Sequence, residues 1–333
     1  MRPLSYTQAA GIAPAITMVA RDAEAAFLAG GTNLVDLMKI DVTAPTHLVD
    51  ITALASHDPR LARIDELGDG TLRIGSLVSN SDLAHHPPIR SRFPVLSEAL
   101  LSGATVQLRN MATVGGNLLQ RTRCYYFRDT ASPCNKRQPG TGCSATGGYN
   151  RMHAILGGSD QCIAVNPSDM CVALCALDAV VRVRGPGGDR TIPLVDFHRL
   201  PNDRPEQDSV LEHGDFILGV DVPPLPFATR SHYLKVRDRS SYAFALASAA
   251  VALDIQDNVI RGARIALGGV GTKPWRARAA EVTLTGRPPE PAAYRDAAET
   301  ALRDAVPQRF NAFKIELAKR TLVRALTTAG RMT

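Results

Sequence analysis

Short apolar runs separated by glycine-containing turns characterise the first part of the chain. The run Ala23–Leu28 predicts a strand, which leads through Ala29–Asn33 into a helix over Leu34–Lys39. A second strand is expected at Thr46–Ile51. Two strands that flank one helix favour parallel pairing, so this segment predicts a small βαβ unit.

The middle of the chain alternates similar short elements with one long irregular stretch. The expected strands are Thr71–Ile74 and Ala179–Arg184, and the expected helices are Asp82–His85, Pro94–Leu101 and a helix from the cap Ser168 to Leu177. Between these elements, Arg121–Gln161 has little hydrophobic periodicity and is rich in Gly, Pro and Arg. A loop of this length inside a compact protein is usually functional or disordered.

The last hundred residues have a different pattern. Two long apolar runs, Phe244–Ile255 and Val259–Leu267, predict strands that pair through a turn at Asp257–Asn258. Helical spacing follows in Ala292–Leu302 and Asn311–Leu326. The Pro-rich tract 223–227 reads as a linker, so residues 230–333 are expected to form a separate α+β domain.

Composition narrows the possible functions. The 333 residues exceed the size at which a single core usually keeps growing, which favours two or three domains. The net charge is +6, but Lys and Arg are scattered among 32 acidic residues, which argues against a nucleic-acid-binding protein. No apolar run reaches the roughly 20 residues that span a bilayer. The N-terminus does not read as a signal peptide, so we expect a cytoplasmic protein, or a periplasmic one exported with a signal-bearing partner.

Two glycine turns are candidates for binding an anionic cofactor. Ala29–Leu34 lies between a strand and a helix, where adjacent glycines let the backbone direct N–H groups toward a phosphate. Such turns are common and mostly structural, and this one is not a GxGxxG fingerprint. A second turn, Thr113–Leu118, repeats the arrangement of hydroxyl and amide side chains around glycines. This repetition strengthens the functional interpretation.

Taken with their surroundings, both turns resemble the FAD-binding subunit of the xanthine dehydrogenase family of molybdenum hydroxylases. The resemblance covers nearly the whole chain and rests on FLAGGTNLVDLMK (Phe27–Lys39), LRNMATVGGNLLQ (Leu108–Gln120), NPSDM (Asn166–Met170) and the lysine of YLKVRDR (Tyr233–Arg239). It implies an α+β protein with the FAD-binding fold of vanillyl-alcohol oxidase. In that fold two α/β subdomains, here about 1–58 and 59–226, hold FAD, and a C-terminal α+β domain, here 230–333, completes the body.

The resemblance also implies the residues that bind FAD. The pyrophosphate is expected on Phe27, Leu28, Ala29, Gly30, Gly31, Thr32, Asn33 and Leu34, and the ribityl and flavin end on Thr113, Gly115, Gly116 and Asn117. Asp169 is expected on a cofactor hydroxyl, Lys235 near the isoalloxazine, and Gly103 and Leu218 as further cofactor contacts. Without the resemblance, Asp169 could simply complement a helix dipole and Lys235 could be a solvated charge.

Four of the six cysteines lie in or beside the irregular stretch. Cys124, Cys134, Cys143 and Cys162 could form disulfides, bind zinc, bind an iron–sulfur cluster, or do none of these. Disulfides are disfavoured in a large enzyme made in the cytosol, and the tight CxxC pair of many zinc sites is missing. Arg121, Arg123, Arg128, Lys136, Arg137 and Arg151 would suit the negative charge of a cluster. Cys171 and Cys175 lie four residues apart on an apolar helix and are expected to be small buried side chains.

The loop itself carries a second resemblance. RTRCYYFRD, PCNKRQPGTGC and NRMHAILGGSDQC are similar to an insertion found in aldehyde oxidoreductases of the family, which holds a 4Fe–4S cluster on four cysteines. The loop 121–162 is therefore expected to bind such a cluster through Cys124, Cys134, Cys143 and Cys162.

The function implied by the resemblance is electron transfer. A separate large subunit would carry the molybdenum cofactor, and a small subunit with 2Fe–2S centres would relay electrons to FAD in this chain and on to an external acceptor. The assembly would be a heterotrimer or its dimer. No residue reads as a catalytic acid, base or nucleophile, so the flavin would supply the chemistry. The alternative is a non-catalytic scaffold whose cysteine loop binds zinc or a cluster and whose glycine turns are only structural.

Overall fold

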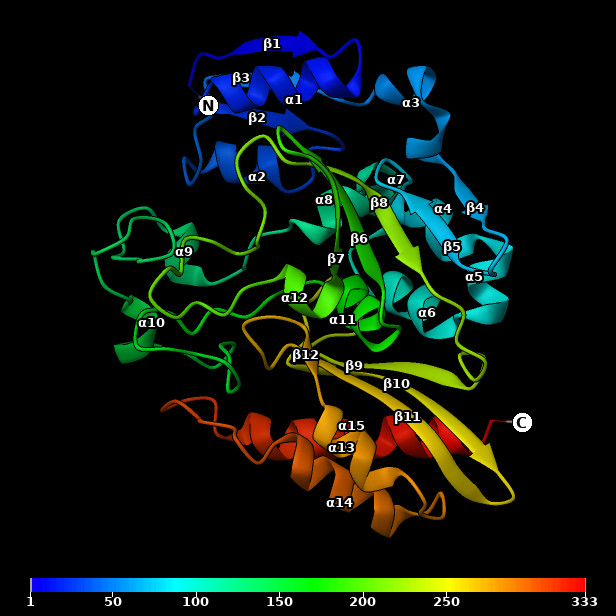
Figure 1. Ribbon diagram of the computed structural model, residues 1–333. Helices are drawn as coiled ribbons and strands as arrows, with labels where there is room; N and C mark the ends of the chain where they lie inside the picture. The colour runs from blue at the N-terminus through cyan, green and yellow to red at the C-terminus, as the bar shows by residue number, and fades with distance from the viewer. Residues whose placement is uncertain (1, 333) are drawn as a thin grey trace.

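Three β-sheets, each covered by helices, follow one another along the molecule in a computed structural model that describes residues 2–332. Figure 1 shows the N-terminal sheet at one end, the C-terminal helices at the opposite end, and a five-stranded sheet between them.

The N-terminal unit is a three-stranded parallel sheet in the order β1-β3-β2. Its elements are β1 (Ser5–Gln8), α1 (Ile12–Arg21), β2 (Ala25–Leu28), α2 (Leu34–Lys39), β3 (His47–Asp50), α3 (Leu54–His57) and η1 (Pro59–Ala62). The predicted parallel β2–α2–β3 unit is confirmed. The strand β1 was not predicted, because its residues are mostly exposed and carry no clear alternation of polar and apolar side chains.

The middle unit contains an antiparallel sheet in the order β4-β5-β8-β6-β7 with a group of short helices packed against it. Its elements before the cysteine loop are β4 (Ile64–Glu66), β5 (Leu72–Gly75), α4 (Asn80–His85), α5 (Pro87–Arg92), α6 (Pro94–Ser102), α7 (Val106–Met111) and α8 (Val114–Leu118). Those after the loop are α11 (Asp169–Ala176), β6 (Val180–Gly185), β7 (Gly188–Pro193), α12 (Leu194–Phe197) and β8 (Phe216–Val222).

Strand β8 joins the cores of the N-terminal and middle units. Val183 pairs with Ile217 and Arg182 with Gly219, so Leu218 is an extra residue that bulges from β8. The bulge reverses the alternation of side chains. Phe216 and Leu218 therefore pack in the N-terminal core, while Val220 and Val222 pack in the middle core. A strand buried on both faces shows no alternation in sequence, which explains why β8 was not predicted.

The stretch between α8 and α11 is an ordered loop on one side of the molecule, as Figure 1 shows. It contains only two single-turn helices, α9 (Tyr125–Arg128) and α10 (Ser144–Gly147). Its position beside α2 and α12 brings it against both the N-terminal and the middle units.

The C-terminal unit is an antiparallel sheet in the order β12-β11-β10-β9, covered by three helices. Its elements are β9 (Ser231–Val236), β10 (Ala247–Gln256), β11 (Val259–Gly268), β12 (Trp275–Arg276), α13 (Arg278–Leu284), α14 (Pro291–Ala301) and α15 (Phe313–Gly330). The predicted hairpin is confirmed: Asp257 and Asn258 both adopt positive φ, as a tight turn between β10 and β11 requires. Across residues 2–332, no helix is long and apolar enough to cross a membrane.

The packing of α15 on β10 identifies a position where a core substitution should destabilise the C-terminal unit. Leu322 is fully buried in the core between this helix and the sheet. Leu322→Ala is expected to lower the free energy of unfolding by about 2–5 kcal/mol, because it removes apolar contacts and leaves a cavity. Denaturant unfolding of the purified chain measures this change. The matched control is Val282→Ala on the exposed side of α13, for which a change within about 0.5 kcal/mol is expected.

Candidate functional site

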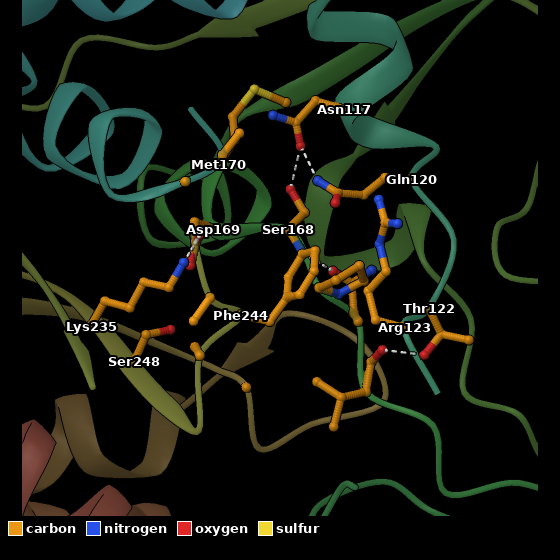
Figure 2. Close-up of a pocket in the computed structure, with 18 of the residues that line it drawn as sticks. Asn117, Gln120, Thr122, Arg123, Ser168, Asp169, Met170, Lys235, Phe244 and Ser248 are labelled. Carbon is orange, nitrogen blue, oxygen red and sulfur yellow. Dashed lines mark hydrogen bonds and ion pairs between the residues drawn. The ribbon is translucent and has the colours of Figure 1, made fainter. Parts of the chain in front are cut away.

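A large cavity lies where the middle unit, the cysteine loop and the C-terminal sheet meet. Its volume is about 590 Å³, which is within the range of cofactor pockets. Figure 2 shows side chains that line it, from Asn117 on one side to Lys235 and Ser248 on the other. The cavity is therefore formed by segments far apart in the sequence, as a large elongated cofactor requires.

The second glycine turn is helical. Thr113 caps α8 by accepting a hydrogen bond from the backbone N–H of Gly116 (3.2 Å), so the predicted turn at 115–117 is in fact the body of a short helix. Gly116 and Asn117 line the pocket. Gly115 faces away from it and its N–H donates to the carbonyl of Ser76 (2.8 Å). Thr113 and Gly115 therefore hold α8 in place, behind the residues that face the cavity.

The first glycine turn reaches the pocket through its last two residues, Thr32 and Asn33. Gly30 lies against the backbone of α7, where a Cβ atom would come within 1.7 Å of the Met111 carbonyl oxygen. Gly31 has a φ of +70°, which favours glycine. The turn is thus packed directly against the segment that leads into α8.

The remaining predicted residues of this region lie behind the pocket wall. Phe27 packs edge-on against Phe216, with ring centroids 5.4 Å apart, and Leu218 is buried in the same N-terminal core. Neither side chain lines the cavity, and the same holds for Leu28, Ala29, Gly30, Gly31 and Leu34.

The N-terminus of α11 carries the best-defined polar group in the pocket. Asp169 accepts hydrogen bonds from Lys235 Nζ on β9 (2.7 Å) and from the Tyr233 hydroxyl (2.6 Å). The side chains of Asp169 and Lys235 are 10% and 3% exposed, so the pair is shielded from water. Gly103 lies beside it, because a Cβ atom there would be 3.3 Å from Asp169 Oδ2. The structure therefore brings together the predicted residues Gly103, Asp169 and Lys235.

A second polar contact links α11 to α8. The Ser168 hydroxyl caps α11 by accepting from the N–H of Cys171, and it also donates to Asn117 Oδ1 (2.8 Å). Asn117 Oδ1 accepts a second hydrogen bond, from Gln120 Nε2. Figure 2 shows these three side chains converging at one end of the cavity. Asn117 is consequently held in one orientation at the pocket wall.

Several buried polar atoms around the pocket have no partner within residues 2–332. They are Asn33 Nδ2, Asn80 Oδ1, Arg109 Nε, Arg123 Nε, His153 Nδ1 and Ser248 Oγ. Unpaired buried polar atoms cost free energy, so their concentration around one cavity indicates a bound polar molecule. Asn80, Arg109, His153 and Ser248 were not singled out from the sequence, since each lies outside the two glycine turns.

The four loop cysteines surround a second, smaller cavity. Cys124, Cys134, Cys143 and Cys162 all line it, and Cys134 pairs with Cys143 in an isolated antiparallel bridge. All four thiols are free. Burial raises the pKa of Cys124 to about 12 and that of Cys162 to about 11, so these thiols stay protonated unless a metal displaces the proton.

The arrangement of these thiols does not match a single-metal site. Within residues 2–332, no three Cys, His, Asp or Glu side chains converge closely enough to hold one metal ion. A 4Fe–4S cluster places each thiolate on a different iron, so its ligands are spread more widely than those of one zinc ion. Cys171 and Cys175 line neither cavity and are fully buried on α11, as predicted.

Carboxylates partly neutralise the predicted positive environment of the loop. Asp208 accepts from both Arg121 and Lys136, and Asp36 on α2 pairs with Arg123 and Arg128. The paired arginines hold the pKa of Asp36 below its ordinary value, against the opposing effect of burial. Of the predicted cations, Lys136 lines the cysteine cavity, while Arg123 and Arg128 line the larger pocket. These ion pairs attach the loop to the rest of the protein.

Comparisons with known proteins agree with this geometry. Residues 2–225 match the family described as the FAD binding domain in molybdopterin dehydrogenase, and residues 232–329 match the CO dehydrogenase flavoprotein C-terminal domain. The chain is 47% identical over 330 residues to the aldehyde oxidoreductase FAD-binding subunit PaoB of Escherichia coli, covering 99% of both chains.

More distant relatives share the whole length of the fold. The carbon monoxide dehydrogenase medium chain of Hydrogenophaga pseudoflava is 26% identical over 310 residues, covering 92% of this chain and 89% of the relative. A solved structure of carbon monoxide dehydrogenase from the same organism superposes with a TM-score of 0.76 at 25% identity, covering 98% of this chain and 97% of that one. The predicted fold class is confirmed.

The buried Asp169–Lys235 pair leads to a prediction about the pocket. Lys235→Met is expected to destabilise the chain by roughly 3–5 kcal/mol, because it leaves the Asp169 carboxylate buried without its counter-charge. Adding Asp169→Asn should recover much of that stability, since the double variant buries no unpaired charge. Unfolding free energies of the single and double variants measure both effects. If the double variant is no more stable than Lys235→Met, the pair is not the source of the loss.

Proposed function

Because the chain belongs to the FAD-binding subunits of the molybdenum hydroxylases, we propose that it binds FAD in the large pocket and passes electrons through it to an external acceptor. The observation that carries this proposal is the set of unpartnered buried polar atoms around a pocket of cofactor size. A bound flavin supplies a redox group that exchanges one or two electrons. The residues of this chain bind and orient it.

In this proposal the two predicted glycine segments bind different parts of FAD. Thr32 and Asn33 offer a hydroxyl and an unpaired amide donor toward the pyrophosphate, with the rest of 27–34 supporting them from behind. Gly116 allows close approach of the cofactor to α8, and Asn117 faces its ribityl and flavin end. Thr113 and Gly115 hold this helix in place, and Leu218 supports the same region from the N-terminal core.

Residues on the opposite wall would contact the isoalloxazine ring and the hydroxyl groups of FAD. Asp169 keeps one carboxylate face toward the cavity while Tyr233 and Lys235 fix its position. Lys235 places a positive charge where electron density on a reduced flavin would gather. Gly103 leaves room beside this pair.

We also propose a 4Fe–4S cluster on Cys124, Cys134, Cys143 and Cys162. Four thiols around one small cavity supply the donor set that such a cluster uses, and Lys136 in the same wall adds positive charge. With its ligands deprotonated, the cluster adds a one-electron group beside the flavin.

The relatives support a proposal about the partners and the substrate class. These relatives include subunits and medium chains of an aldehyde oxidoreductase, a carbon monoxide dehydrogenase and a caffeine dehydrogenase. We propose that this chain assembles with a molybdenum-cofactor large subunit and a 2Fe–2S small subunit, as a heterotrimer or its dimer, in an aldehyde-oxidising complex. The complex would act in the cytoplasm, or in the periplasm after co-export with a signal-bearing partner.

The first prediction of this function concerns the flavin. The purified chain should hold one FAD that acid precipitation releases into the supernatant, because neither glycine segment contains a His or Cys for a covalent link. Cys124 and His153 line the pocket and are residue types that can form a covalent link to FAD, but their side chains contact each other. Flavin fluorescence of supernatant and pellet is the measurement. A colourless chain argues for the scaffold alternative, and flavin retained in the pellet contradicts noncovalent binding.

The second prediction concerns the cluster. Serine in place of Cys124, Cys134, Cys143 or Cys162 should lower the iron per chain and the visible iron–sulfur absorbance, because each substitution removes one ligand. Cys171→Ser and Cys175→Ser are matched controls, since these thiols lie in the core of α11. Iron analysis of the folded variants tests the assignment. Normal iron in all four loop variants would rule out the proposed ligand set.

A further inference from the structure

The two cavities share a wall, and Cys124 is part of it. This residue is the one cysteine that lines both the large pocket and the cysteine cavity in residues 2–332. If the proposed cluster and flavin occupy these cavities, the Cys124 sulfur is the ligand nearest the flavin. Whatever contacts this sulfur therefore acts at the junction of the two redox groups.

His153 makes that contact. Its Nε2 lies 3.1 Å from Cys124 Sγ, and the side chain also lines the large pocket. The residue is only 2% exposed. A cluster-bound thiolate accepts hydrogen bonds and cannot donate them, so the proton of this contact must reside on the histidine nitrogen.

The backbone of His153 is held in place by a buried set of hydrogen bonds. The His153 backbone N–H donates to the carbonyl of Asn150 (3.0 Å), and its carbonyl accepts from Asn311 Nδ2 (3.2 Å) and Lys314 Nζ (2.9 Å). Asn150, Asn311 and Lys314 are all fully buried. These bonds, one of them from Lys314 on α15, fix the backbone position from which the imidazole reaches Cys124 Sγ.

The second ring nitrogen of His153, Nδ1, differs from Nε2 in its contacts. Nδ1 is buried and has no partner within residues 2–332. When Nε2 carries the proton, Nδ1 of a neutral imidazole is a free acceptor. Nδ1 of His198 is also unpaired in the described residues, so what distinguishes His153 is that its side chain lines the large pocket and contacts Cys124.

We propose that His153 is a positioning residue that donates its Nε2–H to the Cys124 sulfur and thereby raises the reduction potential of the cluster at its flavin-facing ligand. The inference rests on the proposed function, since it requires the cluster. Hydrogen bonds to ligand sulfurs stabilise the more negative, reduced cluster, which makes reduction easier. A higher potential favours electron transfer onto the cluster.

The test compares two substitutions in the purified complex. His153→Phe keeps a planar ring without a donor, and His153→Gln keeps a donor. The cluster midpoint potential is measured by redox titration of the reduced-cluster EPR signal, alongside iron and FAD per chain. His153→Phe is expected to shift the potential to a more negative value, and His153→Gln to restore much of the shift. The matched control is His198→Phe, which removes another buried histidine whose Nε2 contacts the Leu118 carbonyl, away from the cysteines.

Each outcome bears on the inference. An unchanged potential in His153→Phe with normal iron overturns it and leaves the proposed function intact. An equal shift in His198→Phe also overturns it, because the effect would then be general. If His153→Phe loses the iron of the 4Fe–4S cluster, retention of that iron by His153→Gln supports the hydrogen bond, and its loss from both variants contradicts it. A wild-type complex whose iron content is no greater than its 2Fe–2S centres require instead refutes the proposed cluster itself.

Discussion

The N-terminus of α11 is the constraint on which the pocket depends. Ser168 ties this helix to Asn117 on α8, and Asp169 ties it to Lys235 and Tyr233 on β9. Two adjacent residues thus connect the middle unit to the C-terminal sheet across the cavity. Both contacts are largely buried, so water competes little with them and the orientation of the pocket walls is determined by hydrogen bonds as well as by apolar packing.

The elements that could be predicted from the sequence are those whose signals are local. The turn at Asp257–Asn258 and the cap at Ser168 depend on the backbone preferences of a few adjacent residues, and both were predicted. Strand β8 depends on two different cores and a bulge at Leu218, so its pattern could not reveal it. The Gly-Gly-Asn segment was expected to be a turn, but the Thr113 side chain caps it into a helix.

The distinction between local sequence signals and tertiary packing also applies to the residues of the candidate site. Resemblance of short motifs pointed to Asn117, Asp169 and Lys235, which the fold brings to one cavity. It could not separate pocket-lining residues from those that support them, because Gly30 and Gly116 look alike in sequence. Only the packing distinguishes them: Gly30 lies against the Met111 carbonyl, whereas Gly116 faces the cavity. Arg109 and His153 lie within quoted motifs, but only the tertiary structure shows that they line the pocket.

The cysteine loop forms part of the wall of the large pocket. Asp36 on α2 holds Arg123 and Arg128 of the loop, and both arginines line the large pocket. Arg123 also stacks over Phe244, which lines the pocket from the C-terminal unit, at 5.1 Å from the ring centroid. The loop therefore contacts all three units around the cavity, and Cys124 belongs to both cavities. The cysteine cavity and the large pocket therefore have the Cys124 side chain in common, so a change at this residue alters both.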